Sequence, residues 1–158
     1  KTWSERAKRA LKKFNSFELK VEDTDCKTFI EGLQSSTLKK FLRRSYASTI
    51  KFFEHAPTMF WVIKKDGEVL GGLAVINYSE NISAHFVAFI TKKGKKLQVG
   101  TGLIDHWYNH SLKNKIKYLN FGYIREEGEP NSWQGYTDFK RNFVEREFVF
   151  RNSYFRFF

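Results

Sequence analysis

The C-terminal part of the chain, residues 115–158, reads KIKYLNFGYIREEGEPNSWQGYTDFKRNFVEREFVFRNSYFRFF and decides the fold. β-Branched and aromatic residues at 117–121 predict a strand, and a Gly-containing loop follows it. The residues around Phe139-Lys140-Arg141 predict a short amphipathic helix that follows the Trp133-Gln134-Gly135 loop and has Lys140 at its start. Two strand-like runs split by Asn152-Ser153 predict a closing hairpin.

The middle of the chain predicts an antiparallel meander. Runs 59–64 and 69–78 are joined through Asp66-Gly67, a strong hairpin signal because both turn positions tolerate positive φ. Consecutive glycines at Gly71 and Gly72 predict a bulge or a close approach within the second run. A third run at 82–90, a helix at 101–114 and the strand at 117–121 form a βαβ unit, so its two strands should be parallel or splayed.

Three helices are predicted before this meander. Residues 1–15 form a basic amphipathic helix, a second helix is capped among residues 23–25, and a third begins after Ser36 or Thr37. A short strand is predicted at 17–21. Together these elements predict one α+β domain over residues 1–158, with a mixed sheet of about six or seven strands and flanking helices.

Composition narrows the class of protein. The chain has 158 residues with 17 Phe, 7 Tyr and 4 Trp, which predicts a single aromatic-rich core. Cys26 is the only cysteine and no stretch resembles a signal peptide, so a cytoplasmic location is expected. No apolar run approaches the roughly 20 residues that a membrane-spanning helix needs.

The net charge of +11 is unevenly distributed. Residues 1–51 hold thirteen Lys or Arg against six Asp or Glu, and residues 92–117 hold seven against one. Such a field attracts phosphate-bearing partners, including CoA, tRNA and anionic lipid head groups. A solvated surface without a specific partner is the alternative interpretation.

A Lys- and Gly-rich loop at 92–102 precedes the helix of the βαβ unit. Backbone N–H groups at a helix N-terminus with glycine neighbours can hold a pyrophosphate. The predicted phosphate-binding residues are Gln98, Val99, Gly100, Thr101, Gly102 and Leu103. An ordinary flexible connection between strand and helix is the alternative.

Two motifs resemble the GNAT superfamily of acyltransferases, and within it the FemAB-like branch. The strand motif "Tyr-Leu-Asp-Phe-Gly-Gly" appears as residues 118–122, with Asn120 in the position of the Asp. The motif "Gly-x-x-x-Phe-Lys-x-x-Phe" appears as residues 135–143. The Gly loop is similar to the GNAT pyrophosphate loop, with Leu97 where that loop has Gln or Arg.

The resemblance implies roles for the residues that match. Lys140 would lie beside the reacting carbonyl, where a cation stabilises the developing negative charge. Tyr136 would protonate the departing thiolate, and Asn120 would stand where relatives carry a carboxylate. Trp133 and Phe139 are predicted to contact the substrate.

The resulting prediction is an N-acyltransferase that passes an acyl or aminoacyl group from acyl-CoA (such as acetyl-CoA) or aminoacyl-tRNA directly to a small-molecule or peptide amine. A non-catalytic GNAT-like module that binds RNA or an anionic membrane through its basic face is the alternative. No metal is expected, because His106 and His110 have zinc-ligand spacing on a helix but lack an evident third ligand.

Overall fold

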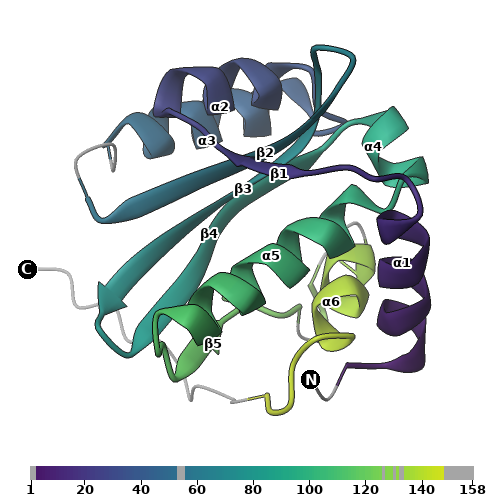
Figure 1. Ribbon diagram of the computed structural model, residues 1–158. Helices are drawn as coiled ribbons and strands as arrows, with labels where there is room; N and C mark the ends of the chain where they lie inside the picture. The colour runs from purple at the N-terminus through teal and green to yellow at the C-terminus, as the bar shows by residue number, and fades with distance from the viewer. Residues whose placement is uncertain (1–2, 53–55, 126, 130, 132–133, 148–158) are drawn as a thin grey trace, which may run out of the picture.

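The computed structural model describes residues 3–52, 56–125, 127–129, 131 and 134–147. Within these residues it forms a five-stranded mixed sheet flanked by six helices (Figure 1). The strands are β1 (Val21–Asp23), β2 (Thr58–Lys65), β3 (Glu68–Ser79), β4 (Ile82–Ile90) and β5 (Tyr118–Asn120). The helices are α1 (Glu5–Asn15), α2 (Cys26–Gln34), α3 (Lys40–Phe52), α4 (Lys92–Lys96), α5 (Val99–Lys113) and α6 (Gln134–Arg141).

The strands follow chain order across the sheet. β1 to β4 are antiparallel neighbours, whereas β5 is parallel to β4 and is reached through α5, which confirms the predicted βαβ unit. The hairpin prediction is also confirmed: Lys65 pairs with Glu68, and Asp66 and Gly67 have φ values of 52° and 78°. Both central residues are therefore left-handed, as a tight hairpin of this kind requires.

Helices cover both faces of the sheet, with α2 and α3 on one face and α1, α5 and α6 on the other (Figure 1). β2 shows how the side chains of one strand are shared between the two faces. Trp61 and Ile63 belong to the buried cluster beneath α5, while Phe60 and Val62 belong to the cluster beneath α2 and α3. Because successive side chains of a strand point to opposite faces, this one apolar run supplies both cores.

Gly71 and Gly72 meet the expectation of a local irregularity and a close approach. Ile63 pairs with Gly71 and Lys64 with Val69, so Leu70 is the extra residue of a bulge. A Cβ on Gly72 would lie 2.6 Å from the Phe89 ring and 2.8 Å from that of Phe29. Side chains of the core, rather than a ligand, occupy the space that the missing Cβ leaves.

The predicted count of six or seven strands is wrong for the described residues, which hold five. The runs predicted to form the closing hairpin fall largely at residues 148–158, outside the described part. The strand predicted at 17–21 is displaced along the chain: β1 begins only at Val21. Glu18 has a positive φ of 54°, so the residues just after α1 form a turn and not a strand. The third helix, α3, begins at Lys40 and not directly after Ser36 or Thr37 as predicted. The Thr37 N–H donates to the Ile90 carbonyl 3.1 Å away, so residue 37 belongs to the connection before the helix.

The segment 92–96 is a short helix and not the predicted loop. Thr91 caps it: its hydroxyl accepts a hydrogen bond from the Gly94 N–H at 3.1 Å. The following helix, α5, starts at Val99, two residues before the predicted start. None of the helices in the described residues is both long and apolar enough to cross a bilayer.

Candidate active site

The most distinctive geometric feature is an early end to the pairing between β4 and β5. Only three pairs join them, and the last is Ala84 with Asn120. From His85 onward β4 has no β5 partner, although it continues to Ile90. The predicted splay between the two strands of the βαβ unit is therefore present, and we call the region beyond Ala84 and Asn120 the β4–β5 opening.

Gly122 turns the chain away from β4 at this opening. Its φ is +70°, a value that favours glycine, and its N–H donates to the Asn120 side-chain oxygen at 2.7 Å. A Cβ here would lie 3.7 Å from the Lys140 Nζ and 3.9 Å from the His85 carbonyl. Asn120 thus shapes the exit of β5, and Gly122 lets that exit pass close to the amine of Lys140.

Helix α6 carries Tyr136 and Lys140 to the opening, four residues apart and so on one helix face. Lys140 lies in the last turn of α6, which corrects the prediction that it stands at the helix start. Only 4% of Lys140 is exposed. Its Nζ donates to the Tyr123 carbonyl at 2.6 Å and lies 4.4 Å from the centroid of the Tyr136 ring.

Burial lowers the pKa of Lys140 to about 8. Desolvation disfavours the charged form of an amine, which explains the direction. The group is still mostly protonated at neutral pH. One of its three N–H groups is engaged by Tyr123, so Lys140 retains donors for an oxygen that develops negative charge.

His85 is a site residue that the sequence interpretation missed. Its Nε2 lies 2.8 Å from the Tyr136 hydroxyl. Burial, and then the charge of Lys140, lower the pKa of His85 to about 3, so the imidazole is neutral at physiological pH. The one available signal was a histidine inside the otherwise apolar strand run SAHFVAFI.

Tyr136 is 44% exposed, and its hydroxyl is hydrogen-bonded to the His85 ring. Desolvation of that hydroxyl, and then Tyr46 of α3, raise its pKa above the usual range. No carboxylate of the described residues contributes to the pKa shift of His85, Tyr136 or Lys140. The cluster formed by these three residues therefore presents a positive charge and a neutral phenol–imidazole pair at the opening.

The predicted phosphate-binding residues are brought together at the start of α5, where Gln98 is the N-cap in a left-handed conformation with φ 59°. The first N–H groups of a helix have no intrahelical partner, and here these belong to Val99 and Gly100. Gly100 and Gly102 in this turn also allow neighbouring side chains to pack closely against the helix. A Cβ on Gly102 would lie 2.4 Å from the Phe14 ring, and one on Gly100 would lie 2.7 Å from Ile90.

The other predicted residues are placed as follows. Phe139 packs in the core, with its ring centroid 5.0 Å from that of Phe143. Trp133 lies outside the described residues. His106 and His110 pack on Trp61, with centroid distances of 4.9 and 5.2 Å. In the part of the chain that the structure describes, no three His, Cys, Asp or Glu residues are grouped to hold a metal.

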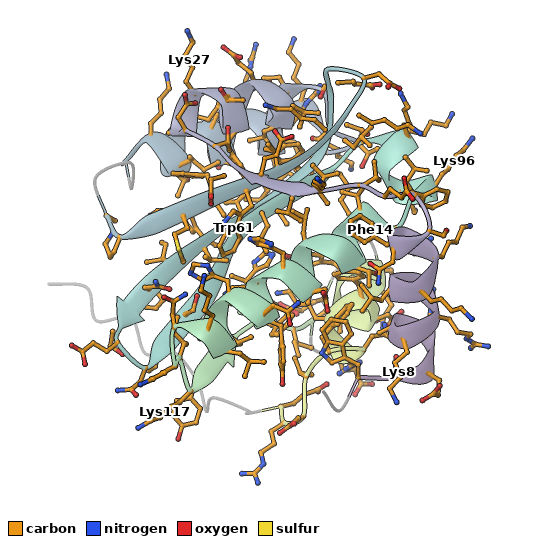
Figure 2. The ribbon with its side chains drawn as sticks, in the orientation of Figure 1. Lys8, Phe14, Lys27, Trp61, Lys96 and Lys117 are labelled. Carbon is orange, nitrogen blue, oxygen red and sulfur yellow. The ribbon has the colours of Figure 1, made fainter. Side chains whose placement is uncertain are left out.

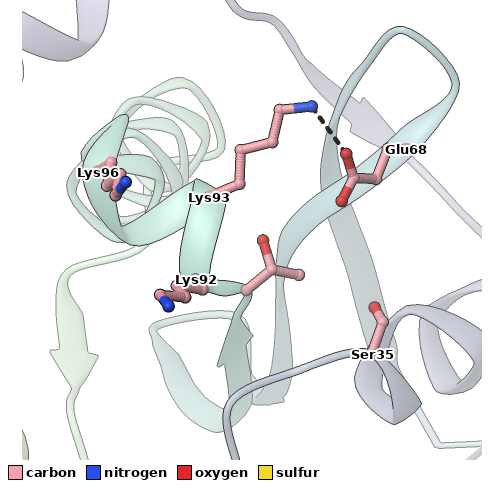
Figure 3. A pocket seen from close by; sticks show the side chains of 6 residues that line it. Ser35, Glu68, Lys92, Lys93 and Lys96 are labelled. Atoms are coloured by element: carbon pink, nitrogen blue, oxygen red, sulfur yellow. Dashed lines mark hydrogen bonds and ion pairs between the residues drawn. The ribbon is translucent and has the colours of Figure 1, made fainter.

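A shallow hollow lies beside α4 and shares no residue with the cluster at the opening (Figure 3). Its lining includes three lysines, and one of them, Lys93, is paired with Glu68 at 2.8 Å. The two hydroxyl groups of the lining are already hydrogen-bonded within the protein. The Thr91 hydroxyl donates to the Leu70 carbonyl, and the Ser35 hydroxyl donates to the Gly32 carbonyl. The buried cation Lys140, and the large pKa shifts of Lys140 and His85, are found instead at the β4–β5 opening.

No protein-family model matches the sequence, and no curated protein matches it. Solved structures do resemble the fold. A possible acetyltransferase from Clostridium difficile 630 gives a TM-score of 0.62 at 10% identity, over 88% of this chain and 99% of the other. AAC(6')-Iy, in complex with the bisubstrate analogue CoA-S-monomethyl-acetylneamine, gives 0.58 at 12% identity, over 87% and 99%.

The ribosomal-protein-alanine N-acetyltransferase from Brucella melitensis biovar Abortus 2308 gives a TM-score of 0.57 at 12% identity, over 88% of this chain and 99% of the other. The chain thus has the fold of acetyltransferases, in agreement with the GNAT-type architecture that the sequence predicted. The narrower FemAB-like resemblance stays a prediction.

Proposed function

We propose that the protein is an N-acyltransferase that passes an acyl group from an acyl-CoA thioester to an amine. The observation that carries this proposal is the buried ammonium of Lys140 at the β4–β5 opening, within an acetyltransferase fold. One structural neighbour was solved with a bisubstrate analogue of CoA, which supports CoA as the donor. The acceptor would enter the opening from the side of His85 and Tyr136.

The chemistry needs no covalent enzyme intermediate. The lone pair of the neutral acceptor amine attacks the thioester carbon, and the carbonyl oxygen becomes an oxyanion. A free N–H of Lys140 donates to that oxygen, in a site where burial strengthens the interaction. Collapse then breaks the C–S bond, and the proton lost by the amine nitrogen balances the proton gained by the thiolate.

Donor phosphates would bind at the start of α5, where the N–H groups of Val99 and Gly100 have no intrahelical partner and lysines of α4 lie just upstream. An aminoacyl-tRNA would present the same kind of electrophilic carbonyl, and the FemAB-like resemblance keeps it as a second donor class. Trp133 and Phe139 remain proposed substrate contacts.

Calorimetric titration and a transfer assay test the proposal together. Acetyl-CoA and longer acyl-CoAs should bind, and an acceptor screen should show acyl transfer that Lys140→Ala slows strongly without weakening donor binding. Equal loss of turnover and donor affinity would make Lys140 a binding residue only. Tight binding of tRNA with no binding of any acyl-CoA would favour an aminoacyl donor.

A non-catalytic polyanion-binding function is the second candidate, favoured by the basic residues of α1 and α4. Both helices flank the start of α5, because Phe14 of α1 packs on Gly102 and α4 ends just before Val99. Lys8 and Lys96 lie along the same edge in Figure 2. RNA affinity should fall steeply with salt if this edge binds RNA, and a flat dependence would exclude it.

A further inference from the structure

The Tyr136 hydroxyl has a fixed hydrogen-bond partner, and the direction of that bond determines what Tyr136 does. The nearest ring nitrogen of His85 is Nε2, at 2.8 Å, while Nδ1 is 3.4 Å away. If Nε2 carried the proton, the phenol O–H would be free to point into the opening. If Nε2 is the acceptor, the phenol O–H is directed at the imidazole and the oxygen lone pairs face the opening.

The backbone at His85 fixes the imidazole. Ala74 pairs with Val87 and Val75 with His85, so Phe86 is an extra residue in β4. A bulge of this kind redirects the neighbouring side chain. It coincides with the end of the β4–β5 ladder at Ala84, so His85 is the first β4 residue whose outer edge is open.

The chemistry of the two partners selects the tautomer. A neutral phenol O–H is a stronger donor than the N–H of a neutral imidazole, and an unprotonated imidazole nitrogen is a stronger acceptor than a phenol oxygen. At 2.8 Å the favoured bond therefore runs from the Tyr136 hydroxyl to Nε2, which leaves the proton of the neutral ring on Nδ1. Among the described residues, the charged and titratable groups that act on this pair are Lys140 on α6, whose Nζ lies 4.4 Å from the centroid of the Tyr136 ring, and Tyr46 on α3, which adds to the effect of burial in raising the pKa of Tyr136.

We infer that His85 is a positioning residue whose Nε2 accepts a hydrogen bond from the Tyr136 hydroxyl. The Tyr136 oxygen is then free to accept an N–H of the incoming amine. This hydrogen bond aims the lone pair of the amine nitrogen at the donor carbonyl. The assignment rests on the proposed acyl transfer and changes the expected role of Tyr136. The hydroxyl orients the acceptor amine, and it does not supply the proton to the departing thiolate. No bond is made or broken at His85 or Tyr136 in this role.

The tautomer can be measured without any substrate, by ¹⁵N NMR of histidine-labelled protein. The expected result is a proton on Nδ1 of His85, no titration between pH 5 and 8, and a displaced Nε2 resonance in Tyr136→Phe. A proton on Nε2, or titration near pH 6.5, would overturn the inference. His106→Phe assigns a second histidine and should leave the His85 resonances unchanged, because His106 packs on Trp61.

Kinetics then test the consequence. His85→Phe should lower kcat/KM for the acceptor about tenfold at unchanged donor affinity, and His85→Gln, whose amide oxygen can accept in place of Nε2, should recover part of that loss. His106→Phe should have no effect. An unchanged acceptor kcat/KM in His85→Phe would overturn the inference, whereas a wild-type protein that transfers no acyl group would overturn the proposed function itself.

Discussion

The first turn of α5 and the β4–β5 opening each hold residues that a sequence reader would single out: glycines in the first and a buried lysine in the second. The two regions differ in what explains those residues. At the start of α5, Gly100 and Gly102 make room for Ile90 and Phe14, so packing alone accounts for both. At the opening, Lys140 is buried, and no carboxylate in the described part of the chain shifts its pKa. A buried amine is destabilising for the fold, and such a group is a better sign of function than a short glycine pattern.

The largest effect is expected from removing the Lys140 amine. Loss of one donor to the developing oxyanion should lower kcat about 100- to 1,000-fold in Lys140→Ala. Wild-type kcat/KM should also decline above a pH of about 8, because the ammonium loses its proton there. Steady-state kinetics against pH measure both effects.

Lys140→Arg is the matched control for the alkaline decline. A guanidinium stays protonated in this range, so any residual activity of the variant should no longer fall near pH 8. An identical alkaline limb in the two proteins would assign the decline to another group and weaken the role given to Lys140.

Gly102→Ala tests the packing side of the comparison. The new Cβ would approach the Phe14 ring to 2.4 Å, and overpacking of this kind should lower the free energy of unfolding by about 2 to 3 kcal/mol. Gly135→Ala in α6 is the control, since a Cβ there meets no atom of the described residues within 4 Å. Urea denaturation of the three proteins should show a loss only in Gly102→Ala.

Lys140→Met should stabilise the protein while it removes activity. A pKa lowered from 10.5 to about 8 corresponds to roughly 3 kcal/mol of unfavourable burial at pH 7, and the lost bond to Tyr123 offsets about 1 kcal/mol of it. The variant should therefore be more stable by about 2 kcal/mol. Exposed Lys27→Met should change stability little.

The sign of the pH dependence sharpens this test. Between pH 8 and 10.5 the unfolded chain holds the Lys140 proton while the folded protein has released it, so the wild type gains stability as pH rises. The difference in the free energy of unfolding between Lys140→Met and the wild type should thus be smaller at pH 10 than at pH 7. A difference that stays constant would contradict a depressed pKa for Lys140.

The smallest effect is expected at Asn120. Asn120→Ala removes the acceptor of the Gly122 N–H and should lower the free energy of unfolding by about 1 kcal/mol. Asn120→Asp retains a carboxylate oxygen as acceptor and should preserve stability. Thermal unfolding compares the two, and a similar loss in both would show that the amide nitrogen matters.

Local sequence determined much of the fold. The Asp66-Gly67 turn, the β2 run with both its apolar faces, and the βαβ unit around α5 follow from residue patterns over a few positions. The α6 helix and the cationic residue on it were predicted as well. These features depend on backbone preferences and on side-chain periodicity, which neighbouring residues set.

Only the tertiary structure decided which of the candidate residues meet. His85 lies 51 positions from Tyr136, and their contact requires the bulge at Phe86, the early end of the β4–β5 ladder and the approach of α6. The same packing assigned Gly102 to Phe14 and Lys140 to the Tyr123 carbonyl. Burial and long-range contact set these pKa values and hydrogen bonds, and neither is encoded by the residues next to them in the chain.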